Sequence, residues 1–294
     1  MQTTWLDTEE YPFRHHYFQI HGHRLHYIDE GKGETILFVH GTPSWSFEAR
    51  NVIRLLSREY RCIAIDHMGF GLSDKPAGYD YSVLNHSMTL KTFILENDLH
   101  DITLVVHDFG GPIGLYFALC HTGRIRRLII MNSWMWNCAT DPGFIRFSRV
   151  LKSPLLPFLY KYLNFSARFL MPAAFGDTKL SRHILRHFTA PFEKPSHRLG
   201  TVAFAKSLLS DQEWFGQLWE QKEKLLNKPV LFIWGMKDRF TTPAYLDTFI
   251  SGFPEARVVR LEHCGHFPLE EAYARVASEI QVFMTETPAR SVAD

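Results

Sequence analysis

The chain has 294 residues, with 32 Lys or Arg, 31 Asp or Glu and a formal net charge of +1. This length fits one α/β domain with an insertion, and a hydrophobic content of 46% allows a full core. No segment is typical of a nucleic-acid-binding module, and no apolar stretch approaches the ~20 residues that a membrane span requires.

Four cysteines without paired spacing indicate neither a disulfide framework nor a zinc site, so we expect no metal and no cofactor. The first residues lack the basic start and the apolar run of a signal peptide, which predicts a cytoplasmic location. These bounds agree with a single cytosolic enzyme.

Strand and helix patterns alternate along most of the chain. The segment from Tyr17 to Glu30 predicts an antiparallel hairpin. Further strands are predicted at Thr35–His40, Cys62–Asp66, Ile102–Val106, Leu128–Met131, Val230–Trp234 and Arg257–Leu261, with helical patterns between them, notably at Ser87–Glu96 and Gly111–Cys120. Such alternation predicts an α/β fold with a mostly parallel, doubly wound sheet.

The strand pattern stops between Ser133 and about Leu226. This stretch is rich in Phe, Leu and Pro, and it predicts several short helices. We therefore expect a core formed by residues 1–132 and 227–294, and an inserted helical cap formed by residues 133–226 that covers the site on the core.

A strand-turn-helix motif surrounds Asp108. In Val-Val-His-Asp-Phe-Gly-Gly, residues 105–111, an apolar strand leads into a carboxylate and paired glycines open a helix. Side chains would clash in so tight a turn, so the motif predicts a nucleophile elbow with Asp108 as the nucleophile. A carboxylate suits displacement at saturated carbon and leaves an ester that water can cleave. The alternative is an Asp that only caps the next helix.

Two later strands end in candidate partners for Asp108. The strand at 230–234 leads to Asp238 and the strand at 257–261 leads to His263 and His266, in the order nucleophile, acid, histidine. We expect His266 to act as general base on a water and Asp238 to fix its tautomer. His263 is the rival base. His266 is favoured because it follows a loop glycine and precedes residues typical of a helix start.

The turn after the strand at 35–40 supplies a further candidate group. His40-Gly-Thr-Pro43 should place the backbone N–H of Thr42 beside the elbow. Together with the N–H of Phe109, it would form an oxyanion or leaving-group hole.

Several motifs together resemble the haloalkane dehalogenases, with the epoxide hydrolases as close cousins. They are His40-Gly-Thr-Pro-Ser-Trp-Ser-Phe47, Asp66-His-Met-Gly-Phe-Gly-Leu-Ser-Asp-Lys-Pro76, the Asp108 elbow, Trp234-Gly-Met-Lys-Asp238 and Gly265-His-Phe267. The resemblance covers both core segments and implies an α/β-hydrolase fold. It also implies that Asp108 attacks a carbon bearing a halogen, that His266 activates water against the alkyl-enzyme ester, and that Asp238 is the triad acid. One branch of the family carries its acid where this chain has Asn132.

The chain departs from this family at the leaving group. A tryptophan normally follows the nucleophile and donates its indole N–H to the halide, whereas this chain has Phe109, which has no such donor. A second halide ligand, usually Asn or Glu, is replaced by Thr42. Possible pocket residues are Trp45, Asn132, Trp134 and Trp136, and the three tryptophans offer an indole from another direction.

Three other functions stay open for a small-molecule substrate that is apolar, halogenated or anionic. Epoxide hydrolysis needs cap hydroxyls, and the only tyrosines of the predicted cap, Tyr160 and Tyr162, would point away from each other on a helix. A ligand-binding homologue would keep the scaffold without turnover. Hydrolysis of esters or lactones fits an Asp nucleophile less well, because attack on an acyl carbon gives a labile anhydride.

The predicted cap is basic, which the small net charge hides. From Asp141 to Lys206 there are eleven Lys or Arg against three Asp or Glu. The simple interpretation is a solvated helical surface. The alternative is attraction to an anionic substrate, an acidic partner or a membrane surface.

Overall fold

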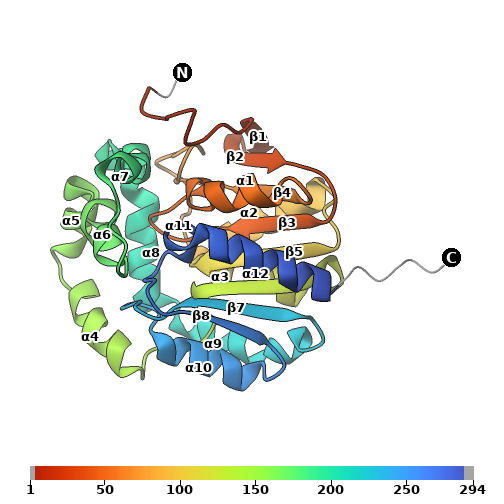
Figure 1. The fold of residues 1–294 in the computed structure, drawn as a ribbon. Coiled ribbons are helices and arrows are strands. Elements are labelled where there is room, and N and C mark those ends of the chain that lie inside the picture. The colour runs from red at the N-terminus through yellow and green to blue at the C-terminus, as the bar shows by residue number, and fades with distance from the viewer. Residues whose placement is uncertain (1–3, 288–294) are drawn as a thin grey trace.

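The structure, a computed structural model, describes residues 4–287, which form one eight-stranded sheet flanked by helices (Figure 1). The strands are β1 His16–Ile20, β2 His23–Glu30, β3 Thr35–Val39, β4 Arg61–Ile65, β5 Ile102–Asp108, β6 Ile125–Ser133, β7 Val230–Gly235 and β8 Arg257–Leu261. Their order across the sheet is β1-β2-β4-β3-β5-β6-β7-β8. The β1–β2 and β2–β4 pairs are antiparallel and the others are parallel, which confirms the predicted fold class.

Helices cover both faces of this sheet. The α-helices of residues 4–287 are α1 Arg50–Leu56, α2 Val83–Glu96, α3 Gly110–Cys120, α4 Pro142–Leu151, α5 Leu156–Leu163, α6 Met171–Ala173, α7 Arg182–Thr189, α8 Leu199–Ser210, α9 Gln212–Glu220, α10 Pro243–Gly252, α11 Pro268–Glu271 and α12 Tyr273–Glu286. Helices α2, α3 and α10 pack on one face, and α1 and α12 pack on the other.

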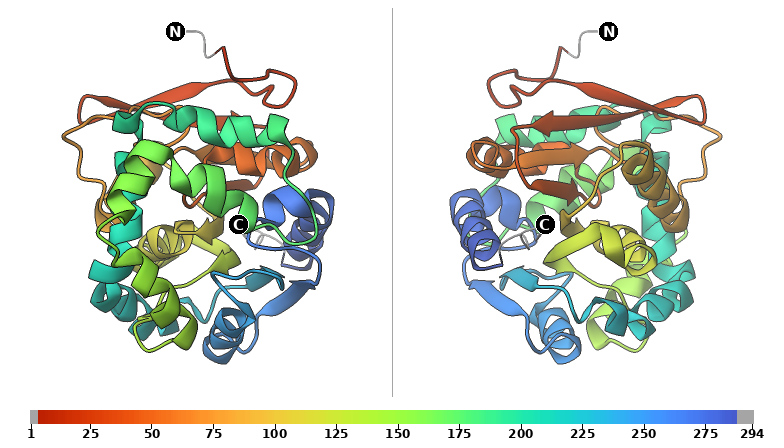
Figure 2. Two further views of the ribbon diagram at one scale, coloured as in Figure 1. Left: turned by 90° about the vertical axis from the view of Figure 1, so that its left-hand side faces the viewer. Right: turned by 90° about the vertical axis from the view of Figure 1, so that its right-hand side faces the viewer.

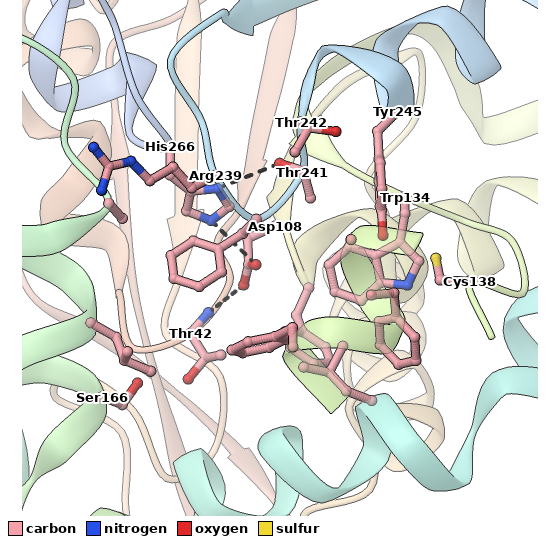
Figure 3. Close-up of a pocket in the computed structure, with 18 of the residues that line it drawn as sticks. Thr42, Asp108, Trp134, Cys138, Ser166, Arg239, Thr241, Thr242, Tyr245 and His266 are labelled. Carbon is pink, nitrogen blue, oxygen red and sulfur yellow. Dashed lines mark hydrogen bonds and ion pairs between the residues drawn. The ribbon is translucent and has the colours of Figure 1, made fainter. Parts of the chain in front are cut away.

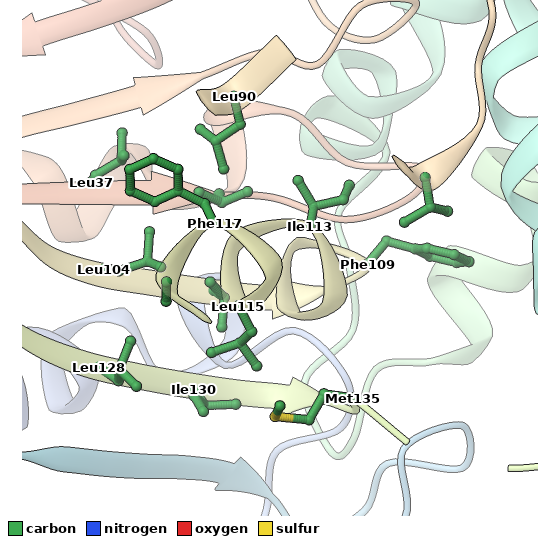
Figure 4. Packing of buried hydrophobic residues seen from close by; sticks show 14 of the residues in the cluster. Leu37, Leu90, Leu104, Phe109, Ile113, Leu115, Phe117, Leu128, Ile130 and Met135 are labelled. Carbon is green, nitrogen blue, oxygen red and sulfur yellow. The ribbon is translucent and has the colours of Figure 1, made fainter. Parts of the chain in front are cut away.

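Alternating side chains of the central strands divide the core into two layers. In β3, Leu37 and Val39 belong to the layer under α2 and α3, whereas Ile36 and Phe38 belong to the layer under α1 and α12. Both sets are buried because both faces are covered, which explains why these strands are nearly continuous apolar runs. Figure 4 shows the first layer, to which α3 contributes Phe117.

Helices α4 to α9 fill the segment between β6 and β7. In Figures 1 and 2, helices α4 to α8 gather on the side of the molecule where the parallel strands have their carboxyl ends. This arrangement supports the predicted cap, whose boundaries at 133 and 226 stay a prediction. Strand β6 runs past its predicted end at Met131, because Asn132 and Ser133 both find buried hydrogen-bond partners.

Gly110 begins α3 where this helix passes close to β3. A Cβ at Gly110 would lie 2.0 Å from the backbone carbonyl oxygen of Val39. We expect Gly110→Ala to lower the free energy of unfolding by about 1–3 kcal/mol, because the backbone must shift to make room. Gly123→Ala is the matched control, since nothing lies within 4 Å of its Cβ position. Urea unfolding measures both variants, and equal stabilities would contradict the expectation.

Candidate active site

Asp108 ends β5 at the sharp turn into α3. Its φ of 51° lies in the left-handed region, a strained conformation that is typical of a nucleophile elbow. The backbone N–H of Thr42, after β3, donates to Asp108 Oδ1 at 2.8 Å. The hydroxyl of Ser133, at the end of β6, donates to the Asp108 carbonyl oxygen at 2.6 Å. Both neighbouring strands therefore hold this turn, and the carboxylate lies at the carboxyl edge of the sheet.

His266 lies between two carboxylates, and Figure 3 shows its contact with Asp108. Its Nε2 is 3.3 Å from Asp108 Oδ2, and its Nδ1 is 2.7 Å from Asp238 Oδ2. The side chains of His266, Asp108 and Asp238 are 4%, 11% and 0% exposed. His266 thus contacts both carboxylates in a largely buried site, and the catalytic roles of the three residues stay predictions.

Three donors besides His266 converge on Asp238. The side-chain amide of Asn132 donates to Oδ2 at 2.8 Å, the backbone N–H of Phe240 donates to Oδ1 at 2.7 Å, and the Thr241 hydroxyl donates to Oδ2. Burial alone would raise the pKa of Asp238, but the charge and hydrogen bond of His266, together with the hydrogen bonds from Thr241 and Phe240, hold this pKa below its usual value.

The two carboxylates set the charge of His266. Burial opposes a charged imidazole, yet Asp238 and Asp108 outweigh this effect and raise the pKa of His266 from 6.5 to about 10. The resting site therefore holds an imidazolium at neutral pH. The pKa of His266 in the folded chain lies above that of an ordinary His, so the charged ring stabilises the folded state. This contribution is complete below pH 6.5 and is lost as the pH rises through about 10.

The loop that carries His266 is bound to the cap segment after α6. The His266 N–H donates to the carbonyl oxygen of Ala174 at 2.9 Å. The Glu271 carboxylate accepts the backbone N–H of Gly176 at 2.7 Å and that of Gly265 at 2.9 Å. One carboxylate therefore joins the histidine loop to the cap.

His263, the rival base, lies outside the site. Its side chain is 84% exposed, and its Nδ1 is 2.9 Å from Asp177 Oδ2. Asp177 also pairs with Lys237. His263 therefore belongs to a surface ion-pair cluster, and the geometry favours His266 as the base.

A buried acid-imidazole pair beneath the site was missed by the sequence reasoning. His107 directly precedes the nucleophile, and its Nδ1 is 3.2 Å from both carboxylate oxygens of Glu48. Its Nε2 donates to the carbonyl oxygen of His266 at 2.6 Å. Acceptors thus face both ring nitrogens, and the ring fixes the backbone of His266. Two features of the sequence could have indicated this pair: His107 lies within an apolar strand, and Glu48 directly follows the aromatic motif at residues 40–47.

A cavity of about 180 Å³ opens over Asp108 and His266, between the sheet edge and the cap (Figure 3). From the core, its lining includes Thr42, Phe109, Phe240, Tyr245 and Phe267, and Trp134 lines it from the start of the predicted cap segment. From the cap, it includes Phe144, Phe147, Tyr160, Leu170 and Met171. This mainly aromatic and aliphatic lining fits an apolar substrate.

Three predicted pocket residues lie outside this cavity. Trp45 is fully buried, and its indole N–H donates to a backbone carbonyl oxygen of α7 at 3.0 Å. Trp136 packs against aromatic rings of α9 and α10. The side-chain amide of Asn132 donates its hydrogen bond to Asp238. Of the four predicted residues, only Trp134 contributes to the lining, because local packing turns the others away.

Phe109 places an aromatic ring, without a side-chain donor, next to the nucleophile. Its ring meets Trp134 edge-to-face at 4.9 Å between centroids and packs on Phe204 at 4.6 Å. The indole N–H of Trp134 is buried and has no hydrogen-bond partner among residues 4–287; in Figure 3 it points toward Cys138 and away from Asp108. The backbone N–H of Thr42 is bonded to Asp108 Oδ1, and the leaving-group hole formed by the N–H groups of Thr42 and Phe109 stays a prediction.

The two cap tyrosines face opposite ways on α5. Tyr160 is buried and lines the cavity, whereas Tyr162 is exposed. Burial raises the pKa of the Tyr160 hydroxyl, so this group stays protonated and can donate a hydrogen bond into the cavity.

Comparison with known proteins gives matches along most of the chain. A family model described as alpha/beta hydrolase fold matches residues 34–273. Haloalkane dehalogenase 2 of Mycobacterium tuberculosis is 33% identical over 276 residues, which cover 93% of this chain and 96% of that protein. Cis-3-alkyl-4-alkyloxetan-2-one decarboxylase of Shewanella oneidensis is 33% identical over 285 residues, which cover 94% of this chain and 90% of that protein.

Solved structures with a similar fold include the haloalkane dehalogenase DatA from Agrobacterium tumefaciens. The two structures superpose with a TM-score of 0.83, covering 94% of this chain and 97% of that one. The sequence identity is 23%, so this likeness shows the shared fold.

The raised pKa of His266 depends on the charge of Asp108. We expect Asp108→Asn to lower the pKa of His266 from about 10 toward its ordinary value, because one of two neighbouring carboxylates is lost. An NMR titration of the imidazole resonances, assigned with His266→Gln, measures the change. Asp177→Asn is the control, because this carboxylate contacts His263 instead. A pKa that stays near 10 in Asp108→Asn would refute the electrostatic coupling.

Proposed function

This chain belongs to the α/β hydrolase fold family and is a haloalkane dehalogenase-like hydrolase, and from this membership we propose that Asp108 displaces a leaving group from a saturated carbon. The observation that carries the proposal is the contact of His266 with Asp108 at 3.3 Å and with Asp238 at 2.7 Å. A carboxylate nucleophile forms an ester, and a base touching that nucleophile can direct water onto it. The proposed reaction converts a haloalkane to an alcohol and a halide.

In the first step, Asp108 attacks the carbon that bears the halogen. The N–H of Thr42 binds Oδ1 at 2.8 Å, which leaves Oδ2 as the attacking oxygen. A bond forms between Oδ2 and the carbon while the carbon–halogen bond breaks, and the halide leaves with the electron pair. The product of this step is an alkyl ester of Asp108.

In the second step, His266 becomes the base. Esterification removes the negative charge of Asp108, so the imidazole keeps only Asp238 as a charged partner and its pKa falls from about 10. The imidazolium releases its proton to solvent, which is the proton that the overall reaction produces. The neutral ring then accepts a proton from water, and the resulting hydroxide attacks the carboxyl carbon of Asp108. The alcohol leaves, and the Asp108 carboxylate is restored.

The cavity supports a small apolar substrate, because aromatic and aliphatic side chains dominate its lining. Arg239, an exposed cation that also lines the cavity, adds a place for an anionic group. We place the enzyme in the cytoplasm, since its four cysteines are all free, as in a reducing compartment.

Replacing the proposed base separates the two steps. We expect His266→Phe to be alkylated on Asp108 by 1-bromoalkanes without being regenerated, because the first step needs no base. Intact-protein mass spectrometry detects the adduct, and peptide mapping locates it. His263→Phe is the matched control and should turn over as the wild type does. An unmodified His266→Phe protein, with a wild type that consumes the same bromoalkane, would refute the two-step mechanism.

A second candidate is ring opening and decarboxylation of a four-membered lactone. It is favoured by Phe109, because the ring next to the nucleophile has no hydrogen-bond donor for a departing halide. A halide departs as a separate anion and needs donors, whereas the carboxylate released from a lactone ring stays attached to the substrate. The Shewanella oneidensis relative is named for the decarboxylation of such a lactone.

The bonds of this second route balance without water. Asp108 attacks the saturated ring carbon that is bonded to the ring oxygen, the bond between this carbon and the ring oxygen breaks, and a carboxylate forms on the adjacent carbon. The bond to that carboxylate then breaks and releases carbon dioxide. Its electron pair forms a carbon–carbon double bond as the ester bond to Asp108 breaks. The nucleophile is thereby restored without His266 as base, and Arg239 supplies a cation for the transient carboxylate.

Phe109→Trp distinguishes the two candidates. We expect it to raise the rate of bromide release from bromoalkanes at least about tenfold, because an indole donor is restored beside the nucleophile. Alkene formation from a cis-3,4-dialkyl-oxetan-2-one should stay equal or fall, since the larger ring crowds Trp134 and Phe204. Bromide and alkene release are measured on the same preparations, after thermal melting has shown a folded variant.

Phe147→Trp, in the cap side of the cavity, is the control for a change in pocket volume alone. Bromide release that is unchanged in Phe109→Trp, beside rapid alkene formation in the wild type, would select the second candidate. Gains of equal size in Phe147→Trp would contradict a specific donor role at position 109.

A further inference from the structure

The outer side of the cap exposes many large apolar side chains. Seven of the thirteen that are exposed among residues 4–287 fall between positions 145 and 169, and their exposures range from 41% to 63%. We call these seven the outer cap surface: Ile145, Val150, Leu155, Phe158, Tyr162, Leu163 and Phe169. Figure 2, left, turns helices α4 and α5, which carry most of them, toward the viewer.

These helices are apolar on their inner sides as well. Leu151 of α4 and Leu156 and Tyr160 of α5 are buried in a small cluster under the cap. A surface helix of a globular protein normally has one apolar stripe and an opposite polar face. An apolar outer face is therefore unexplained by the packing of this chain, and clustered exposed apolar side chains mark interaction sites.

The same segment carries one sign of charge. Residues 142–176 contain five Lys or Arg and no Asp or Glu. They are Arg146, Arg149, Lys152, Lys161 and Arg168, and none of them forms an ion pair with a carboxylate among residues 4–287. On α4, Arg146 and Arg149 share the exposed side with Ile145 and Val150. Cations and apolar side chains are therefore interleaved on one surface.

We propose that the outer cap surface docks on an anionic membrane surface. The apolar side chains insert among the lipid headgroups, while the unpaired cations meet lipid phosphates, as in interfacial amphipathic helices. A second copy of the chain fits less well, because pairing this surface with itself brings like charges together. Among the described residues, no helix has the length and apolar character to cross a bilayer, so the contact would be peripheral.

Docking in this way would bring the cap close to apolar substrate molecules dissolved in the membrane. The inner sides of α4 and α5 line the cavity through Phe144, Phe147 and Tyr160. Docking through the outer sides would hold that cavity wall at the membrane, where apolar molecules concentrate. The docking itself does not depend on which reaction Asp108 performs.

Vesicle sedimentation tests the proposal. The full chain is mixed with vesicles of phosphatidylcholine alone or of phosphatidylcholine with phosphatidylglycerol. We expect binding to the anionic vesicles only, and weaker binding as salt rises. Leu155→Ser combined with Phe158→Ser should weaken binding at least tenfold, and Arg149→Ser should weaken it about fivefold, since one cation near an anionic surface contributes about 1 kcal/mol.

Leu84→Ser combined with Met88→Ser on α2 is the matched control, because these exposed apolar residues lie outside the cap. Turnover of a water-soluble substrate in the absence of vesicles separates this test from the proposed reaction, and the Leu155/Phe158 variant should retain it. Wild-type protein that stays in solution with anionic vesicles overturns the proposal. Equal binding by the Leu155/Phe158 variant also overturns it. Dimerisation in analytical ultracentrifugation that this variant abolishes would assign the surface to a second copy instead.

Discussion

The charge pairing of His266 with Asp108 and Asp238 is the interaction on which the site depends. Two largely buried carboxylates that contact the same ring would repel each other, and one of them would hold its proton unless a cation lay between them. The imidazolium is that cation, and the carboxylates in turn keep it charged up to a pH of about 10. Nucleophile, base and acid therefore form one electrostatic unit, in which a change of charge on one member changes the proton affinity of the next.

Such a unit needs a rigid frame, and buried polar groups provide it from several directions. Asn132, at the end of β6, binds the acid, while His107 holds the backbone carbonyl of the His266 loop. Glu48 stabilises His107 from the other side. Each support pairs a buried polar atom, so its removal would leave a partner unsatisfied in the interior. The positions of His266 and Asp238 are therefore fixed in large part by buried polar groups of the core.

The sequence identified the three site candidates because each of them follows an apolar strand. The carboxyl ends of parallel strands meet at one edge of a sheet, so distant positions become neighbours once the strands are recognised. No comparable rule predicts which way a side chain within these motifs points. Trp45 belongs to the motif at residues 40–47, and Trp136 lies near the predicted start of the cap. Packing nevertheless directs both side chains away from the cavity. Glu48 and His107 pair across 59 positions, a contact that no local pattern contains.

The bonds between the cap and the histidine loop bear on how molecules reach the buried carboxylate. Ala174 and Gly176 in the cap are joined by main-chain groups to His266 and to Glu271. A hinge motion that lifted this end of the cap would break those bonds and misplace the imidazole in the same movement. Substrate and product would therefore pass at the α4 end of the cap. There the cap contacts the core through side chains, such as the ring of Phe147, whose centroid lies 5.5 Å from that of Phe240. Rotation of such rings would open a path to Asp108 without moving the cap as a body. Helix α4, which carries Phe147, also carries Ile145 and Val150 of the outer cap surface.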